Sequence, residues 1–374
     1  MKCLKYTDIK KIKKLAGDTT LNIIIMFGKR STGKSYTVKK EIIEDFIKDG
    51  KTFVYLRRTR GEVDRGKAGN YWRKMNENGE IRKWTNGVYD GVCAYGDAFY
   101  MYRYENGKRI RCESIGDIVY LASANRLTKS IEYSIHCNKI VFEEFITRDL
   151  YLDNEPYELF QFISTVFRGG NDCYVYLMGN DVTEYFPYKW AWNLNRMEKQ
   201  EQGSLDIYQF TQRDELGEEY TVNIGVYRCA DTEGDQSHIV FGRDANTVNS
   251  VGSAVSYTTV PKGYKFKTLY RIRIIDTGME FMIDLIRDSG GYGVFIYPTS
   301  VYNKLPLNAV ARVIYINPPS YIDTNPLHTT GFLDNKAENL IKKIFRDKSK
   351  VSYADNRVGD RFNMMLKNSG LLFR

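Results

Sequence analysis

One eight-residue run constrains this chain more than any other feature of its sequence. Residues 28–35 read GKRSTGKS, the complete G-x-x-x-x-G-K-S pattern of a phosphate-binding loop. In such a loop backbone N–H groups curl around a phosphate, the lysine reaches the β- and γ-phosphates, and the last hydroxyl binds Mg²⁺. The positions predicted to bind ATP and Mg²⁺ are Gly28, Lys29, Arg30, Ser31, Thr32, Gly33, Lys34 and Ser35.

The residues around the loop supply the context that this motif requires. The run LNIIIMF at 21–27 is apolar and β-branched, as expected of a buried parallel strand. Apolar residues recur at helical spacing over 35–48, Gly50 ends that helix, and 52–57 is typical of a second strand. This order predicts an α/β fold, with a P-loop NTPase domain built on a parallel sheet.

A second pattern provides acidic residues for such a site. Residues 139–145, KIVFEEF, are an apolar run that ends in Glu143 and Glu144. The first acid is expected to hold Mg²⁺, directly or through water, and the second to polarise the attacking water. Glu144 therefore predicts hydrolysis rather than kinase-type transfer. A surface pair of acids is the alternative interpretation.

Three further polar positions follow predicted strands or helices. Arg57 and Arg58 end a strand at its carboxyl edge, where open α/β sheets bind ligands. Asn180 follows the apolar run CYVYLM and is a candidate to orient the water, although turns also favour Asn. Arg168 ends a predicted helix, a position that the helix dipole alone would favour.

The second half of the chain predicts a separate domain. Strand-like runs begin near residue 264, and two helices are expected at 335–347 and 356–368. Residues 200–260 are polar and acidic without strong periodicity, so the boundary is expected there. We expect three domains, over residues 1–210, 211–258 and 259–374.

Charge is unevenly distributed along the 374 residues. Residues 1–120 carry 26 Lys/Arg against 15 Asp/Glu, residues 151–250 carry 7 against 17, and residues 251–374 carry 18 against 10. Two basic parts that flank an acidic middle are suited to a polyanion such as DNA, because Lys and Arg release its condensed counterions. Solvated surfaces without a partner are the alternative.

Composition excludes several other classes of protein. No stretch approaches eighteen uncharged apolar residues, so no transmembrane helix is expected, and the Lys-rich start of the chain does not have the pattern of a secretory signal. The six cysteines form no CxxC pair and there are three histidines, which argues against a zinc site. Free thiols in a reducing compartment are expected.

Taken in order, these motifs resemble one protein family. The set GKRSTGKS, YLRR at 55–58, IVFEEF at 140–145, ISTVFR at 163–168 and LMGN at 177–180 is similar to the DNA-packaging ATPases of small, short-tailed, protein-primed bacteriophages, the phi-29-like group. These are relatives of the terminase large subunit. The resemblance implies a ring-forming ATPase that docks on the portal of an empty procapsid, in the cytoplasm of the bacterial host, and pumps double-stranded DNA inside.

The resemblance also implies roles in nucleotide binding and hydrolysis. Arg30 matches the loop Arg common in the family, and Lys34 and Ser35 match the phosphate and Mg²⁺ residues. Glu144 matches the catalytic Glu. Glu143 stands where most members carry Asp, which leaves its contact with the metal open.

Three more roles concern communication within a ring. Arg168 matches an arginine finger offered to the neighbouring subunit, and a guanidinium can stabilise charge on the transferring phosphoryl group. Arg57 matches a position that couples hydrolysis to subunit motion. Asn180 matches a sensor-like polar residue after its strand.

For the last domain the resemblance implies an RNase H-like fold with a vestigial nuclease. A two-metal nuclease needs several converging carboxylates. Asp276, Asp284 and Asp288 lie near a predicted hairpin, but the strand 293–297 carries no acid. We therefore expect 211–258 to be a small linker domain and 259–374 to contact DNA or the capsid without cleaving DNA.

The expected partners are double-stranded DNA, the portal or procapsid and further copies of the chain, five in a ring as the family suggests, with no membrane. The need for a packaging RNA, as in some relatives, stays open, as does the adenine contact, for which Tyr6 is one candidate.

Three other functions remain as alternatives. One is another ring-forming DNA translocase or helicase. A nucleotide switch is a second, although the nearest guanine-reading pattern, NKAE at 335–338, lies far from the loop and ends in Glu. A structural DNA-binding component is a third, which would leave the phosphate loop and Glu144 without a role.

Overall fold

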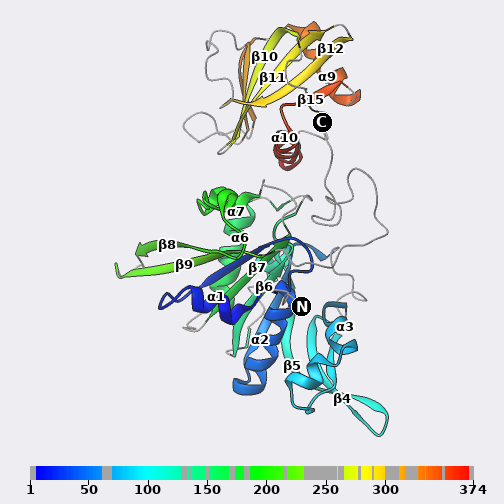
Figure 1. The fold of residues 1–374 in the computed structure, drawn as a ribbon, viewed down its shortest axis with the longest axis vertical. Helices are drawn as coiled ribbons and strands as arrows, with labels where there is room; N and C mark the ends of the chain where they lie inside the picture. Colours follow the sequence, from blue (N-terminus) through cyan, green and yellow to red (C-terminus); the bar gives the residue numbers. More distant parts are fainter. Residues whose placement is uncertain are drawn as a thin grey trace, which may run out of the picture. The chain divides into compact units, whose positions relative to one another are not determined.

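In the computed structural model the chain folds into two compact units, Met1–Val182 with Ala191–Gly252 and Thr183–Trp190 with Ser253–Arg374 (Figure 1). The structure describes residues 6–60, 70–127, 133–134, 136–147, 151–152, 154–167, 173–180, 186–213, 217–230, 259, 265–276, 279–288, 290–299, 311–316, 327–332, 334–347 and 350–369. Each unit is built on its own sheet, so the predicted α/β class is confirmed as a mixed α/β fold with two sheets.

The described part of the first unit contains a nine-stranded sheet in the order β3-β4-β5-β2-β6-β7-β1-β9-β8. Its six central strands, from β5 to β9 in this order, run parallel, and the outer strands are antiparallel to their neighbours. The bounds are β1 Ile23–Gly28, β2 Thr52–Arg57, β3 Gly91–Tyr95, β4 Ala98–Glu105, β5 Lys108–Tyr120, β6 Cys137–Glu143, β7 Tyr174–Asn180, β8 Leu205–Arg213 and β9 Glu219–Arg228.

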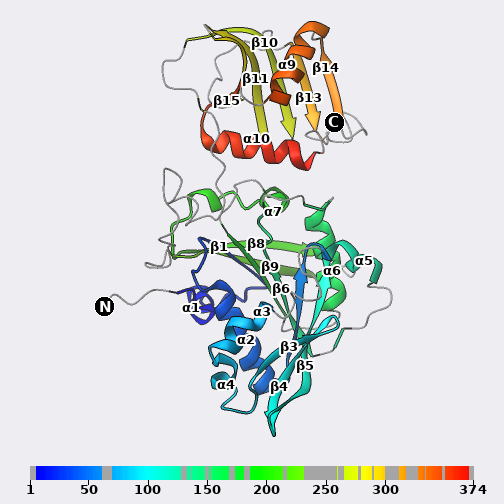
Figure 2. The ribbon, with the colours of Figure 1, turned by 90° about the vertical axis from the view of Figure 1, so that its right-hand side faces the viewer.

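Helices cover both faces of this sheet. The helices α1 to α4 lie on one face and α5 and α6 on the other (Figure 2). Because both faces are covered, the strands β1, β2, β6 and β7 are buried over almost their whole length, as in the β1 sequence IIIMFG. The bounds are α1 Ile9–Leu15, α2 Lys34–Asp49, α3 Asn70–Glu77, α4 Glu80–Trp84, α5 Leu121–Leu127 and α6 Glu155–Val166.

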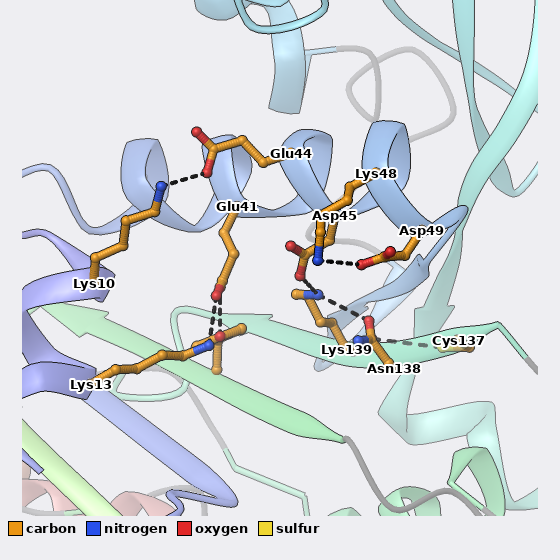
Figure 3. Close-up of polar contacts among 11 residues, drawn as sticks. Lys10, Lys13, Glu41, Glu44, Asp45, Lys48, Asp49, Cys137, Asn138 and Lys139 are labelled. Atoms are coloured by element: carbon orange, nitrogen blue, oxygen red, sulfur yellow. Dashed lines mark hydrogen bonds and ion pairs between the residues drawn. The ribbon is translucent and has the colours of Figure 1, made fainter. Parts of the chain in front are cut away.

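Partly buried ion pairs fix α2, the helix that follows the phosphate loop, against its neighbours (Figure 3). Glu41 accepts from Lys13 of α1 at 2.7 Å and from the hydroxyl of Tyr176 of β7 at 2.6 Å. Asp45 pairs with Lys139, a lysine of β6 that is 1% exposed. Contacts from α1 and two strands therefore set the position of α2, and with it the start of the helix at Lys34.

An antiparallel ribbon, β3 to β5, extends the parallel sheet. A turn at Asn106-Gly107 joins β4 to β5, with φ of 50° and 75° at the two residues, as this two-residue hairpin requires. The long strand β5 then pairs with β4 near the turn and with β2 at its carboxyl end.

A close backbone approach explains Gly116, where β5 passes from one neighbour to the other. A Cβ at this position would lie 2.3 Å from the carbonyl oxygen of Phe53 and 2.5 Å from its ring. We expect Gly116→Ala to lower the free energy of unfolding by about 1–3 kcal/mol, the usual cost of overpacking. Urea unfolding of the variant and of Ser114→Ala, on the same strand, measures this; equal midpoints for the two variants would refute the argument.

The sheet of the first unit continues past the boundary expected at residue 210. Strand β9 lies inside the segment expected to be a linker domain, yet it pairs in parallel with β1, from Ile23 opposite Ile224 to Phe27 opposite Arg228. Strand β8, which spans the expected boundary, pairs with β9. Strand β9 alternates apolar and polar residues from Glu219 to Val226, a strand pattern within the segment expected to lack strong periodicity. Strand β8 lies at the sheet edge, where all but one of its residues are partly or fully exposed.

The described part of the second unit contains a six-stranded sheet in the order β14-β13-β10-β11-β12-β15. Two helices, α9 Asn335–Asp347 and α10 Asn356–Asn368, share one apolar core with this sheet and have the bounds expected from sequence. The strands are β10 Lys267–Asp276, β11 Met279–Asp288, β12 Gly291–Pro298, β13 Arg312–Ile316, β14 Leu327–Gly331 and β15 Val351–Tyr353. Among the described residues, no helix combines the length and apolar character needed to cross a membrane.

Candidate active site

The phosphate loop connects the carboxyl end of β1 to the start of α2. Gly28 ends the strand with φ of 144°, and Gly33 precedes the helix with φ of 87°. A side chain at Gly28 would meet Cys229 at 3.1 Å, so the strand end has no room for a Cβ. Within the loop Lys29, Arg30 and Ser31 are exposed and Thr32 is buried.

Lys34 is the buried cation of this loop. Its Nζ donates to the carbonyl oxygens of Gly28 at 3.2 Å and Lys29 at 2.7 Å, and to Oγ1 of Thr32 at 3.1 Å. The ammonium therefore lies inside the curve of the loop. This is the place from which a phosphate held by the loop N–H groups can be reached.

Ser35 and Glu143 come together as the sequence predicted. The Ser35 hydroxyl donates to Oε1 of Glu143 at 2.5 Å, across 108 residues of sequence. A hydroxyl beside a carboxylate at the mouth of a phosphate loop fits Mg²⁺, which prefers oxygen ligands and keeps several waters. The longer Glu side chain thus reaches the serine that an Asp would be expected to face.

Glu144 lies next to Glu143 but faces a different partner. Its carboxylate is 62% exposed and forms an ion pair with Arg57, with 2.8 Å between Oε2 and Nη2. Its backbone is left-handed, with φ of 58°, an uncommon conformation for a residue with a side chain. Arg57 is buried, so the pair joins a fixed guanidinium to an accessible carboxylate.

Tyr55, which the sequence did not single out, connects these two acids. Its hydroxyl donates to Oε2 of Glu143 at 3.3 Å and accepts from Nη1 of Arg57 at 3.5 Å. Burial, and then the nearby Glu143 carboxylate, raise the pKa of Tyr55 well above its usual value, so the hydroxyl stays protonated and can donate. A chain of polar contacts thus runs from Ser35 to Glu144.

The remaining predicted residues differ in what the structure says of them. Asn180 ends β7 opposite Gly28 of β1, so it lies at the same sheet edge as the phosphate loop, and it is half-buried. Arg168 lies outside the described residues. Tyr6, the adenine candidate, packs against Gly33: a Cβ added at Gly33 would lie 3.2 Å from the Cβ of Tyr6. The Tyr6 side chain is exposed.

Sequence reasoning also missed Cys229, which follows β9 and packs beside the loop. Its backbone N–H donates to the Phe27 carbonyl at 2.8 Å, and burial raises the pKa of its thiol. Nothing in the local sequence connects Cys229 to the loop, because β9 reaches β1 only through the tertiary fold.

Arg58, the residue that follows Arg57, is also buried, and it forms an ion pair with Glu155.

Comparison with known proteins gives relatives that match about half of the chain. The DNA packaging protein of Bacillus phage phi29 is 30% identical over 185 residues, which cover 49% of each chain. The DNA packaging protein of Bacillus phage B103 is 32% identical over 181 residues, 46% of this chain and 48% of that one. The match thus spans about half the length of these curated relatives.

A solved structure extends the likeness at the level of the fold. The structure titled "The Phi-28 gp11 DNA packaging Motor" matches 98% of this chain and 98% of its own, with a TM-score of 0.50 and 15% identity. A family model described as Podovirus DNA encapsidation protein (Gp16) matches residues 2–201, more than half of the 374. The loop, the two acids and Arg57 all fall within that match, and the chain belongs to the Podovirus DNA encapsidation protein (Gp16) family.

Proposed function

We propose that this protein is an ATP-hydrolysing motor that moves double-stranded viral DNA into an empty procapsid. The observation that carries the proposal is the convergence at one sheet edge of the phosphate loop, the Ser35–Glu143 contact and the Glu144–Arg57 pair. These groups supply phosphate binding, metal binding and a base for water, which together suit phosphoanhydride hydrolysis. Its similarity to relatives named DNA packaging proteins supports the proposal that DNA is what the motor moves.

Each residue of the site has one task in this proposal. Lys34 and the loop N–H groups bind the phosphates, and Ser35 and Glu143 hold Mg²⁺. The metal, when bound, neutralises charge on the phosphate oxygens. Glu144 takes a proton from the attacking water once its carboxylate leaves Arg57, and Asn180 orients that water.

The proposal also assigns the assembly. The chain forms a ring that docks on the portal of a procapsid in the host cytoplasm. Within the ring, Arg168 of one subunit stabilises the γ-phosphate bound by the next subunit. A motor that packages a genome must accept DNA of any sequence, so we propose that the chain holds DNA mainly through its backbone phosphates.

For domain organisation we propose a P-loop ATPase domain, a short connection and an RNase H-like vestigial nuclease domain. The strand order supports the last: β10, β11 and β12 form an antiparallel meander, and β13 is parallel to β10.

Loss of nuclease activity in that domain is supported by Asp284. Its carboxylate accepts from Arg271 at 2.7 Å on both oxygens and also from Thr268 and Tyr297, and it is 2% exposed. Its oxygens are therefore occupied by four donors rather than open to a metal.

The test of the proposed function is ATP turnover by the full chain with Mg²⁺, with and without duplex DNA. We expect hydrolysis that duplex DNA stimulates. Hydrolysis stimulated only by single strands would favour a helicase, tight nucleotide binding without turnover would favour a switch, and absence of both binding and turnover would refute the proposal.

Mixing subunits tests the assignment of Arg168. Increasing amounts of Arg168→Ala chains are added to wild type at constant total concentration, with duplex DNA. We expect turnover to fall more steeply than simple dilution, because each variant subunit also silences the neighbour that needs its guanidinium. A fall in proportion to the wild-type fraction would mean that Arg168 acts within its own subunit or not at all.

Arg57 gives a prediction about coupling. Because Arg57 pairs with Glu144 in this structure, Arg57→Ala frees the carboxylate from its only described ion-pair partner. We expect turnover without DNA to persist, while its stimulation by duplex DNA is lost. Phosphate release measured with and without DNA checks this; full DNA stimulation in the variant would remove Arg57 from the coupling route. Lys51→Ala, outside the site before β2, is the matched control.

A further inference from the structure

Arg58 makes an unusual set of contacts directly beside the candidate base. Its side chain is 2% exposed, and its Nε and Nη2 donate to the two carboxylate oxygens of Glu155 at 2.7 and 2.9 Å. The same guanidinium donates from Nη1 to the carbonyl oxygen of Glu144 at 3.3 Å and from Nη2 to that of Phe145 at 3.0 Å. One planar group therefore binds a carboxylate and the backbone that carries Glu144.

Glu155 extends this arrangement to the next helix. It is the first residue of α6, is fully buried, and accepts from the backbone N–H of Leu152 at 2.9 Å. The guanidinium also lies over the rings of Phe142, at 5.5 Å, and Tyr151, at 4.7 Å. The end of β6, the segment after it and the start of α6 are thus joined through one side chain.

The backbone at Glu144 needs such support. Its left-handed φ of 58° is unfavourable for a residue with a Cβ, so this conformation persists only where neighbouring contacts determine it. The side chains of Phe145 and Ile146 are only 0% and 4% exposed, and they anchor the residues that follow Glu144. The Glu144 carboxylate itself is exposed and does not fix its own backbone.

The two consecutive arginines therefore contact different parts of Glu144. Arg57, the last residue of β2, reaches the carboxylate of Glu144, and Arg58, the first residue after the strand, reaches its carbonyl. We propose that Arg58, held by Glu155, is a positioning residue that fixes the backbone of Glu144 so that its carboxylate can turn from Arg57 to the attacking water. This inference rests on the proposed hydrolysis and deepens it.

Two variants of the full chain test the proposal. Arg58→Lys keeps the charge but replaces the planar fork with a point charge, which cannot serve Glu155 and two carbonyls together. The double variant Arg58→Met with Glu155→Leu removes both charges, an exchange that buried pairs often tolerate without loss of stability. In both we expect kcat for ATP to fall by about 10- to 100-fold, as misplacing a catalytic group by about 1 Å can do.

Two readouts separate positioning from a general loss of structure. Affinity for a fluorescent ATP analogue should stay at the wild-type value, because the hydrogen bonds of Arg58 described above go to Glu155 and to the backbone of Glu144 and Phe145. Amide hydrogen exchange at 144–147 should become faster. Arg271→Lys is the matched control: it changes a second buried two-point pair, with Asp284, in the other unit. It should lower the melting temperature and leave kcat unchanged.

Wild-type kcat in a folded double variant, or unchanged exchange at 144–147, would overturn the positioning role. Failure of the wild type to hydrolyse ATP would refute the proposed function instead, and the exchange measurement would still decide whether Arg58 holds this backbone.

Discussion

Replacing Glu144 with glutamine is expected to lower ATP hydrolysis by roughly 10²- to 10⁴-fold, the contribution of a positioned general base. The amide has the shape of the carboxylate but cannot accept a proton from water at neutral pH. Nucleotide affinity should change little, because the carboxylate faces Arg57 and not the phosphate loop. Steady-state phosphate release and equilibrium binding of a fluorescent ATP analogue measure the two effects separately.

The matched control for this change is Glu44→Gln. It also removes a carboxylate that pairs with a cation, Lys10 at 3.0 Å, but on the solvent-facing side of α2. Its turnover should equal that of the wild type. A Glu144→Gln protein that hydrolyses ATP normally would remove Glu144 from the reaction, and one that loses affinity at unchanged kcat would place it in nucleotide binding instead.

Replacing Lys34 with alanine is expected to weaken binding of MgATP by about 10²- to 10³-fold. A hydrogen bond to a charged group contributes about 1.5–3 kcal/mol, and an ammonium has three donors. In this structure those donors contact three oxygens of the loop, so the cation is already inside the curve that would receive a phosphate. Titration calorimetry with a non-hydrolysable ATP analogue measures the loss.

Lys40→Ala is the control, since Lys40 lies on the same helix but pairs with Glu44 at 3.7 Å, outside the loop. Its affinity should match the wild type. The Lys34 variant should also keep its melting temperature within a few degrees, because a single polar change in a 374-residue chain typically shifts it by about 2–4 °C per kcal/mol. Unchanged affinity in Lys34→Ala would show that the loop does not bind the phosphates.

The local parts of the site were predictable from sequence because their information is local. The phosphate loop, the strand before it and the helix after it are contiguous, and the structure places them at 23–49 as expected. Glu143 ends an apolar strand and Glu144 follows it, and the pairing of that strand with β2 and β7 brings Glu143 to Ser35 and Glu144 to Arg57. Their roles in catalysis stay predictions, as does that of Arg168.

Other parts were not predictable, because they depend on contacts between distant residues. Strand β9 alternates apolar and polar residues, which is a local strand signal, but that signal does not say which strand it pairs with. Only its pairing with β1 makes it part of the first sheet and brings Cys229 to the loop. Nothing in the sequence shows that Arg58 would be buried against Glu155, 97 residues away, while its neighbour Arg57 meets Glu144.

The sequence by itself determined the α/β class, the phosphate loop and the pair of acids after an apolar run, because those depend on short apolar runs and on residue types at fixed spacing. The tertiary structure decided which groups those residues meet: Glu143 the hydroxyl of Ser35, Glu144 the guanidinium of Arg57, and the backbone of Glu144 the guanidinium of Arg58. The reason is physical, since a parallel sheet brings together the carboxyl ends of strands that are far apart in the chain.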